Sequence, residues 1–291
     1  MKWIRQTSYM LISCGIAACG AGSMQAGGNS TSVTQETLIW SDEFTGTAES
    51  APNPANWTYD TGAGGWGNNE LETYCGYGSN SRPCNPRNPN TYVGGDGYLH
   101  IVARQPSPGV YTSARLKSQG LQSFKYGRIE ASIRMPKGQG MWPAFWMLGD
   151  NIASVGWPSC GEMDIMESIG SKPSTNYGSI HGTGFTGTLL GAPDDLPNGT
   201  KFGDAFHSFG ILWSPQLIKF YVDNPANVYA TYTPSSLPKD AVWPFDGQKF
   251  FFILNVAVGG SWPGSPDSTT VFPQEMLVDY VRVYAEPRLP A

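Results

Sequence analysis

The sequence of 291 residues is short of charged side chains. Only 14% of its residues are Asp, Glu, Lys or Arg, against roughly a quarter in ordinary globular domains. No segment concentrates lysine or arginine, and the net charge is −5. Nucleic acids and acidic membrane surfaces attract clustered cations, so this composition argues against both as partners. A neutral ligand fits it best.

Long apolar runs are also missing. The apolar run from Tyr9 to Cys19 is too short to span a bilayer as a stable helix and follows a basic start at Lys2 and Arg5. It predicts an export signal over residues 1–19, followed by a flexible tether over 20–37. Ile16 to Cys19 resembles a lipobox, which would attach a lipid anchor to Cys19. The alternative is a secreted protein cleaved near Ala21 or Ala26.

Cysteine is scarce after the signal, and no CxxC pair or His/Cys spacing indicates zinc. Only Cys75, Cys84 and Cys160 remain. Because exported proteins meet an oxidising compartment, we expect a Cys75–Cys84 disulfide across a loop rich in proline and asparagine. Cys160 is left without a partner.

The residues in excess are those of a β-protein. The chain has 36 Gly, 23 Pro and 13% aromatic residues, and it contains no long amphipathic helix. Residues 127–136 alternate apolar and polar side chains, which predicts a strand with one buried and one open face. Similar short runs recur between turn residues. They predict a single all-β domain over residues 38–286, a β-sandwich or jelly roll.

Three acids stand together in GEMDIMESIG (161–170). Glu162 and Asp164 share one face of a strand, but Glu167 is out of step. A β-bulge at Ile165–Met166, with Met166 as the extra residue, would return Glu167 to that face. Paired carboxyls are the machinery of a retaining glycosidase, in which one attacks the sugar and the other protonates the leaving oxygen.

This segment strongly resembles the E-x-D-x-x-E signature of glycoside hydrolase family 16, in its laminarinase-like branch. IWSDEF, GGWGNNELETY, YGRIEASIRMPKGQGMWPAFWMLG and VDYVRVY also resemble family segments, in family order. The resemblance implies a jelly roll of two curved antiparallel sheets with an open substrate cleft on the concave face. It also implies that Glu162 is the nucleophile, Asp164 an assisting residue and Glu167 the acid/base.

Substrate contacts are predicted at seven positions. Alternation puts Trp142 and Trp146 on one face, and the resemblance places both in the cleft, although core packing is the alternative for each. Asn68 could instead belong to a turn, and Arg104 could be a surface charge. The remaining candidates are Glu70, His181 and Trp262. Asn255 is expected to be a core amide that bonds the backbone.

The resemblance further implies a structural calcium ion held by Glu43, Gly97 and Asp279, with no cofactor for catalysis. Carboxylate and carbonyl oxygens suit calcium, although Asp279 could equally cap a turn. We therefore expect an exported, monomeric endo-β-1,3-glucanase acting on a polysaccharide. The alternatives are action on mixed-linkage β-glucan or a galactan such as agar, transglycosylation, and a β-glucan-binding protein without activity.

Overall fold

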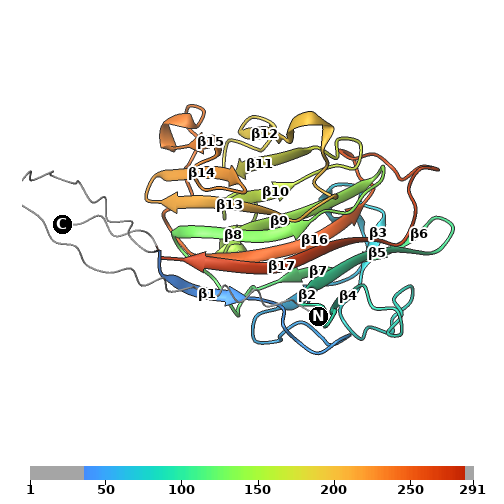
Figure 1. Cartoon of the computed structure of the whole chain (residues 1–291). Helices are drawn as coiled ribbons and strands as arrows, with labels where there is room; N and C mark the ends of the chain where they lie inside the picture. Colours follow the sequence, from blue (N-terminus) through green and yellow to red (C-terminus); the bar gives the residue numbers. More distant parts are fainter. Residues whose placement is uncertain (1–35, 286–291) are drawn as a thin grey trace, which may run out of the picture. The chain divides into compact units, whose positions relative to one another are not determined.

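The computed structural model describes residues 36–285, and β-strands dominate them (Figure 1). The predicted export signal, Cys19 and the tether up to residue 35 lie outside the described residues. In the described part, no helix is long and apolar enough to cross a membrane.

Ten strands form the larger sheet. They are β1 (Leu38–Asp42), β3 (Glu72–Tyr74), β4 (Thr91–Val93), β5 (Leu99–Ser107), β6 (Val110–Ser113), β8 (Gly127–Arg134), β13 (His207–Ser214), β14 (Leu217–Val222), β15 (Val228–Tyr232) and β17 (Gln274–Tyr284). Their order is β15-β14-β13-β8-β17-β5-β6-β3, with β1 also paired to β17 and β4 to β5. Within 36–285, β3 and β6 are the only parallel neighbours.

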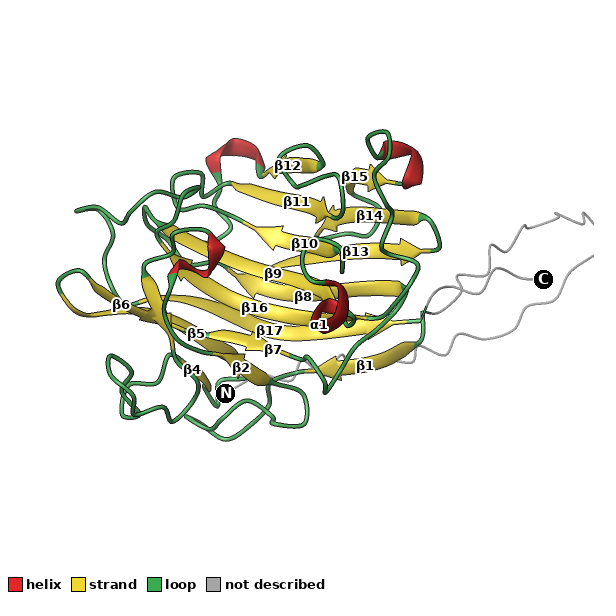
Figure 2. Cartoon of the chain, turned by 180° about the vertical axis from the view of Figure 1, so that it is seen from behind, coloured by secondary structure: helices red, strands yellow, loops and turns green. Residues whose placement is uncertain are grey.

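Seven strands form the second sheet, in the order β12-β11-β10-β9-β16-β7-β2. They are β2 (Thr58–Asp60), β7 (Arg115–Lys117), β9 (Met141–Gly149), β10 (Glu162–Glu167), β11 (Thr175–His181), β12 (Gly191–Asp195) and β16 (Phe250–Val258). The helical turns are short and lie in loops (Figure 2). They are α1 (Ile152–Val155) and the 3-10 turns η1 (Gly65–Gly67), η2 (Pro197–Gly199) and η3 (Pro234–Ser236).

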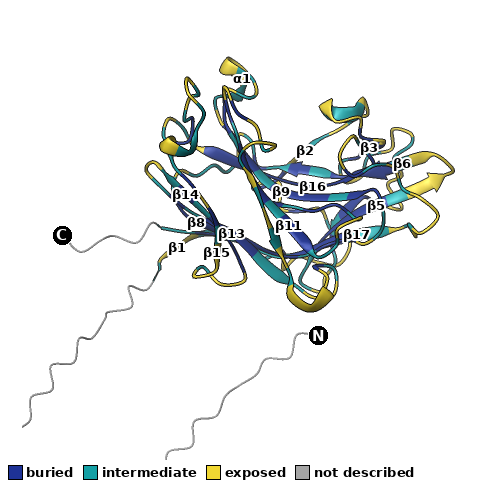
Figure 3. Ribbon diagram, turned by 90° about the horizontal axis from the view of Figure 1, so that it is seen from above, coloured by how far each residue is buried: buried dark blue, intermediate teal, exposed yellow. Residues whose placement is uncertain are grey.

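The core lies between the two sheets, where the strands carry most of the buried surface (Figure 3). From β9, Phe145 and Met147 point into it, and from β10 Met163 does. The intervening residues of β9 and β10 therefore project from the opposite side, the outer face of the seven-stranded sheet. The predicted two-sheet sandwich is confirmed.

The prediction of one open face for residues 127–136 is wrong. Every residue of β8 from Gly127 to Ile133 is buried, including Arg128 and Glu130. β8 lies between β13 and β17, and two tyrosines of β17 contact its polar face: the Tyr284 ring lies 3.7 Å from the Arg128 guanidinium, and the Tyr280 hydroxyl donates to Glu130. Glu130 accepts hydrogen bonds from Arg128 and from the hydroxyl of Tyr221. Charged residues in this segment therefore do not indicate an exposed face, because they are buried together with their partners.

Candidate active site

β10 carries the predicted bulge. Against β9, Asp164 pairs with Trp146 and Met166 with Phe145, so β10 advances two residues where β9 advances one. The unpaired extra residue is Ile165 and not Met166, which corrects the prediction. Sequence could not decide this, because both side chains are apolar and both are fully buried in the core.

Beyond the bulge, the third acid rejoins the other two. Glu167 pairs with Ala144 of β9 and with Tyr177 of β11. Asp164 is buried, whereas Glu162 and Glu167 are half-buried. The bulge thus places all three predicted catalytic carboxyls in one row on the outer face of the seven-stranded sheet.

Burial and mutual repulsion set the protonation of this row. Burial, reinforced by the charge of Glu162, raises the pKa of Glu167 to about 7. Burial and the neighbouring Asp164 raise the pKa of Glu162 well above its ordinary value, and burial and Glu167 raise the pKa of Asp164. Like charges this close cannot all ionise together. The row therefore retains protons near neutral pH.

His181 lies beside the row, as predicted. Its Nε2 is 2.9 Å from Asp164 Oδ2, and Gly187 N–H donates to Nδ1 at 3.2 Å. Burial lowers the pKa of His181, but Asp164 and the two glutamates outweigh this and raise it to about 9. The Gly187 contact favours the neutral ring. The charged ring forms an ion pair with Asp164 through Nε2, so His181 holds Asp164 in place.

Glu162, Asp164 and His181 offer ligand atoms within 4.8 Å of one another. Such a group has the geometry to hold a metal ion. Here Asp164 and His181 already form an ion pair, and a metal ion would have to displace that contact.

Each glutamate of the row accepts an indole hydrogen bond. Trp142 Nε1 donates to Glu167 Oε1 at 3.0 Å, and Trp157 Nε1 donates to Glu162 Oε2. Trp157 comes from the loop between α1 and β10 and is 54% exposed. Sequence reasoning missed it, because nothing in GWPSC distinguishes a loop tryptophan that turns toward the acids.

Aromatic rings gather next to Glu167. The ring of Trp262 meets Trp142 edge-on at 5.4 Å and Tyr177 at 5.0 Å. Trp262 is 41% exposed, so it offers ring surface to a ligand. The predicted pair Trp142 and Trp262 is thus brought together, and Tyr177 is an addition that the alternation of residues 175–181 would have supported.

A chain of hydrogen bonds fixes Trp146. Its Nε1 donates to Asn255 Oδ1 at 2.7 Å, and Asn255 Nδ2 donates to the Tyr74 hydroxyl at 3.1 Å. That hydroxyl donates to Glu70 Oε2 at 2.9 Å, and Asn68 Nδ2 donates to Glu70 Oε1 at 2.9 Å. Glu70 is buried and therefore orients other residues instead of facing a ligand. Asn255 bonds side chains, not the backbone as expected.

A second buried acid lies beside Glu70. Glu72 Oε2 accepts from Val258 N–H at 2.7 Å, while burial and the neighbouring Glu70 raise the pKa of Glu72 to about 8. Glu72 is therefore protonated at neutral pH.

Arg115 is the cation on this face that sequence reasoning missed. It lies opposite Asn255 in the pairing of β7 with β16, and its guanidinium is 4.7 Å from the centre of the Trp146 ring and 5.0 Å from that of Trp66. Its Nε lies 3.0 Å from Asp60 Oδ2, with which it forms an ion pair. The sequence feature that could have indicated Arg115 as a site residue is an arginine in a short strand of a chain with few cations.

Arg104, by contrast, is not at this site. It lies on β5 of the ten-stranded sheet, and its Nε and Nη2 point at Pro89 O, at 3.4 and 3.1 Å. It lines a separate pocket, to which β9, β10 and β16 contribute no residue. Arg104 therefore lies away from the acids, because β5 pairs with β4, β6 and β17 and not with the acid-bearing strands.

The predicted calcium residues lie on neighbouring strands. Asp279 follows Val278, which pairs with Leu99, and precedes Val281, which pairs with Asp42. Gly97 and Glu43 lie within two residues of these partners. The Glu43 carboxylate makes a two-point ion pair with Arg282, at 2.9 and 2.8 Å. Glu43 would therefore offer a calcium ion its main-chain carbonyl, which the prediction allowed.

The disulfide between Cys75 and Cys84 is present, and Cys160 is buried and free, both as predicted.

Comparison with known proteins adds to this geometry. The family model described as glycosyl hydrolases family 16 matches residues 84–282. The chain is 38% identical to a beta-glucanase of Rhodothermus marinus over 97% of this chain and 95% of that protein. Two solved structures are also similar. The endo-beta-1,3-glucanase of Pyrococcus furiosus has 45% identity and a TM-score of 0.76, covering 86% of this chain and 94% of that one. The laminarinase catalytic domain of Thermotoga petrophila has 41% identity and a TM-score of 0.77, covering 88% and 100%.

Proposed function

The chain belongs to glycosyl hydrolases family 16, and from this membership we propose that it hydrolyses internal β-1,3-glucosidic bonds of laminarin-like glucans with retention. The observation that carries the proposal is the row of Glu162, Asp164 and Glu167, which the bulge in β10 keeps on one face. It is the arrangement of a glycoside hydrolase with two acting carboxyls and a third between them.

In the first step, the Glu162 carboxylate attacks the anomeric carbon while Glu167 gives its proton to the departing glycosidic oxygen. The bond from that carbon to the leaving sugar breaks as the bond to Glu162 forms. Glu167, now a carboxylate, then removes a proton from water, whose oxygen replaces Glu162. Two inversions give net retention. The pKa of Glu167 near 7 suits a group that donates a proton and later accepts one.

Glu162 has to be ionised to attack, and burial opposes this. The indole N–H of Trp157 and the charge of His181 both favour the carboxylate. His181 also favours the carboxylate of Asp164. The assisting role proposed for Asp164 is to hydrogen-bond Glu162 and so tune the protonation of the nucleophile.

Rings and polar groups around the row would hold the glucan. Trp262 and Tyr177 present ring surface next to Glu167, and Trp146 does so next to Asp164. Sugar C–H faces pack on such rings, while amides and cations take the hydroxyls. Asn68 and Arg115 supply those groups on the far side of Trp146.

We also propose a structural calcium ion and export. The main-chain carbonyls of Glu43 and Gly97 and the carboxylate of Asp279 would hold the ion, which would tie β1 to β17 without acting in catalysis. The N-terminal segment and the Cys75–Cys84 disulfide support an exported chain, because disulfides persist in oxidising compartments. A lipid on Cys19 and a monomeric state complete the proposal.

The test is chromatography of the products from laminarin, mixed-linkage glucan and agarose. The wild type, Glu162→Gln and the control Glu49→Gln, an exposed residue away from β10, are compared. We expect a ladder of oligosaccharides from laminarin with the wild type and control and none with Glu162→Gln. Cleavage of agarose alone would overturn the substrate, products longer than the substrate would indicate transglycosylation, and binding without cleavage would indicate a glucan-binding protein.

A further inference from the structure

A loop rich in proline and asparagine has no part in the site described above. Residues 81–90, SRPCNPRNPN, follow the disulfide-bonded Cys75 and contain its partner Cys84. The loop contains two turns: Cys84 N–H donates to Ser81 O in the first, and Asn88 N–H and Arg87 N–H donate to Asn85 O and Asn85 Oδ1 in the second. A short loop with this many internal bonds is held in one shape.

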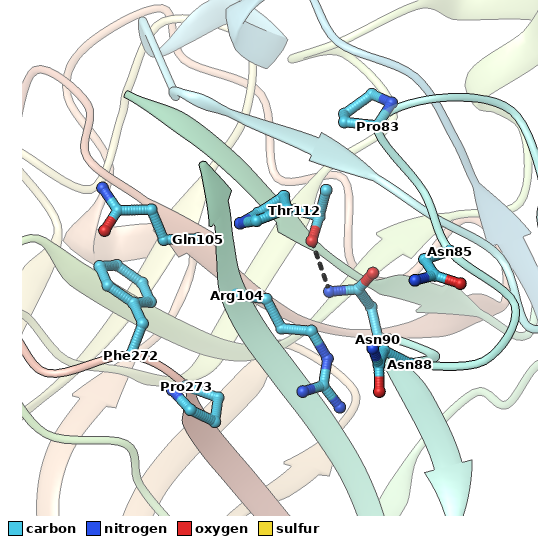
Figure 4. A pocket seen from close by; sticks show the side chains of 10 residues that line it. Pro83, Asn85, Asn88, Asn90, Arg104, Gln105, Thr112, Phe272 and Pro273 are labelled. Atoms are coloured by element: carbon cyan, nitrogen blue, oxygen red, sulfur yellow. Dashed lines mark hydrogen bonds between the residues drawn. The ribbon is translucent and has the colours of Figure 1, made fainter. Parts of the chain in front are cut away.

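The loop forms one wall of a pocket of about 260 Å³. Figure 4 shows its asparagines on one side, Phe272 and Pro273 on the other, and Arg104 between them. This volume is below the roughly 300–1,000 Å³ of pockets that hold drug-sized ligands. It suits one small ring and not a polymer segment.

The polar groups of the pocket are fixed before any ligand arrives. Asn90 is 2% exposed, and its Nδ2 donates to Val102 O at 2.8 Å and to Thr112 Oγ1 at 3.0 Å. Both hydrogens of that amide are committed, so Oδ1 is the atom that remains to accept. Arg104, oriented by Pro89 O, keeps its Nη1 hydrogens to donate. Asn85 and Asn88 add exposed amides at the rim.

One wall is apolar. Phe272 is half-buried, and its ring lies 5.4 Å from that of Tyr111, which fixes its orientation. The lining contains no carboxylate. Fixed amides, one guanidinium and one aromatic face are the groups that bind the hydroxyls and the C–H face of a neutral sugar.

We propose that this pocket is a second carbohydrate site, which binds one neutral sugar unit of a β-glucan, such as a chain end or a branch, apart from the catalytic row. The identity of the polymer rests on the proposed function. The site gives Arg104, the disulfide and the loop one common role: the disulfide anchors the loop, the loop presents its amides, and Arg104 joins them to β5.

The experiment is nuclear magnetic resonance titration of the full exported chain, as the Glu162→Gln variant, with laminaribiose. The side-chain amide signals of asparagine report on the pocket, and the indole N–H signals of tryptophan report on the acid row. We expect both sets to shift. Asn88→Ala should abolish the shifts of the pocket amides while the indole shifts persist, and Asn227→Ala, an exposed asparagine in another loop, should change neither set.

A second measurement uses the active enzyme. Asn88→Ala should lower retention on insoluble β-1,3-glucan several-fold and leave the hydrolysis rate of short soluble oligosaccharides unchanged. Indole shifts without pocket shifts would overturn the second site and leave the proposed function intact. Pocket shifts without indole shifts would sustain the second site and count against the proposed function. If sulfate, but not laminaribiose, shifted the pocket amides, the site would be one for anions and the proposal would be wrong.

Discussion

Tyr74→Phe tests the hydrogen-bond chain that holds Trp146. The ring is 1% exposed, so phenylalanine fills the same space and only the hydroxyl is lost. Glu70 then loses a donor and Asn255 Nδ2 loses its acceptor. A typical hydrogen bond contributes about 0.5–1.5 kcal/mol, and a buried polar group left without a partner costs about 1–3 kcal/mol. We expect the free energy of unfolding to fall by about 2–4 kcal/mol.

The stability assay is urea unfolding, with Tyr98→Phe as control. Tyr98 stacks on Phe206, and its substitution removes a hydroxyl that is not part of the hydrogen-bond chain. The free energy of unfolding should therefore change by at most about 0.5 kcal/mol. Because Asn255 also holds Trp146, Tyr74→Phe should raise KM for laminarin more than it lowers kcat. A loss of stability no larger than that of the control, or an unchanged KM, would refute the role given to this chain.

Two further predictions concern the pH dependence of kcat/KM. Glu167 has to be protonated to donate, so activity should fall as the pH rises through about 7. Trp142→Phe removes the indole N–H that favours the carboxylate of Glu167, so its pKa should rise and the basic limb should move to higher pH; an unmoved limb would contradict the contact. Trp157→Phe removes the donor on Glu162, so the acid limb should also move to higher pH. A profile identical to that of the wild type would show that Trp157 does not act on the nucleophile.

Local patterns predicted the sheets and the catalytic row well. Alternation marked the strands, and the odd spacing of Glu167 pointed to a bulge, because both depend on neighbours in the sequence. Register is a property of strand pairs, so the sequence did not reveal that Ile165, and not Met166, is unpaired. The same limit explains Arg104 and Arg115: both are arginines in strands, and only the pairing of β5 and of β7 shows which one lies near the acids.

Burial of polar groups was the other limit. Asn255 and Glu130 looked like backbone-bonding or exposed residues, yet each is buried with a side-chain partner that is distant in sequence. Such partners meet only in the folded structure, so no local sequence pattern predicts them. The disulfide, whose two cysteines are nine residues apart, could be predicted because its partners are local.

The bulge in β10 also makes the row of acids insensitive to a change in chain length. Asp164 lies opposite Trp146, and Glu167 lies opposite Ala144, two positions away on β9. This spacing on β9 is the same whether one or two residues of β10 separate the two acids. Removal of Ile165 would leave three acids at even spacing on a regular strand, still facing the same way. The extra residue instead adds a second apolar side chain beneath the row, where Ile165 and Met166 both reach the core. A one-residue insertion here therefore alters the layer that supports the acids and not their order, so the packing beneath the site can change while the chemistry above it is kept.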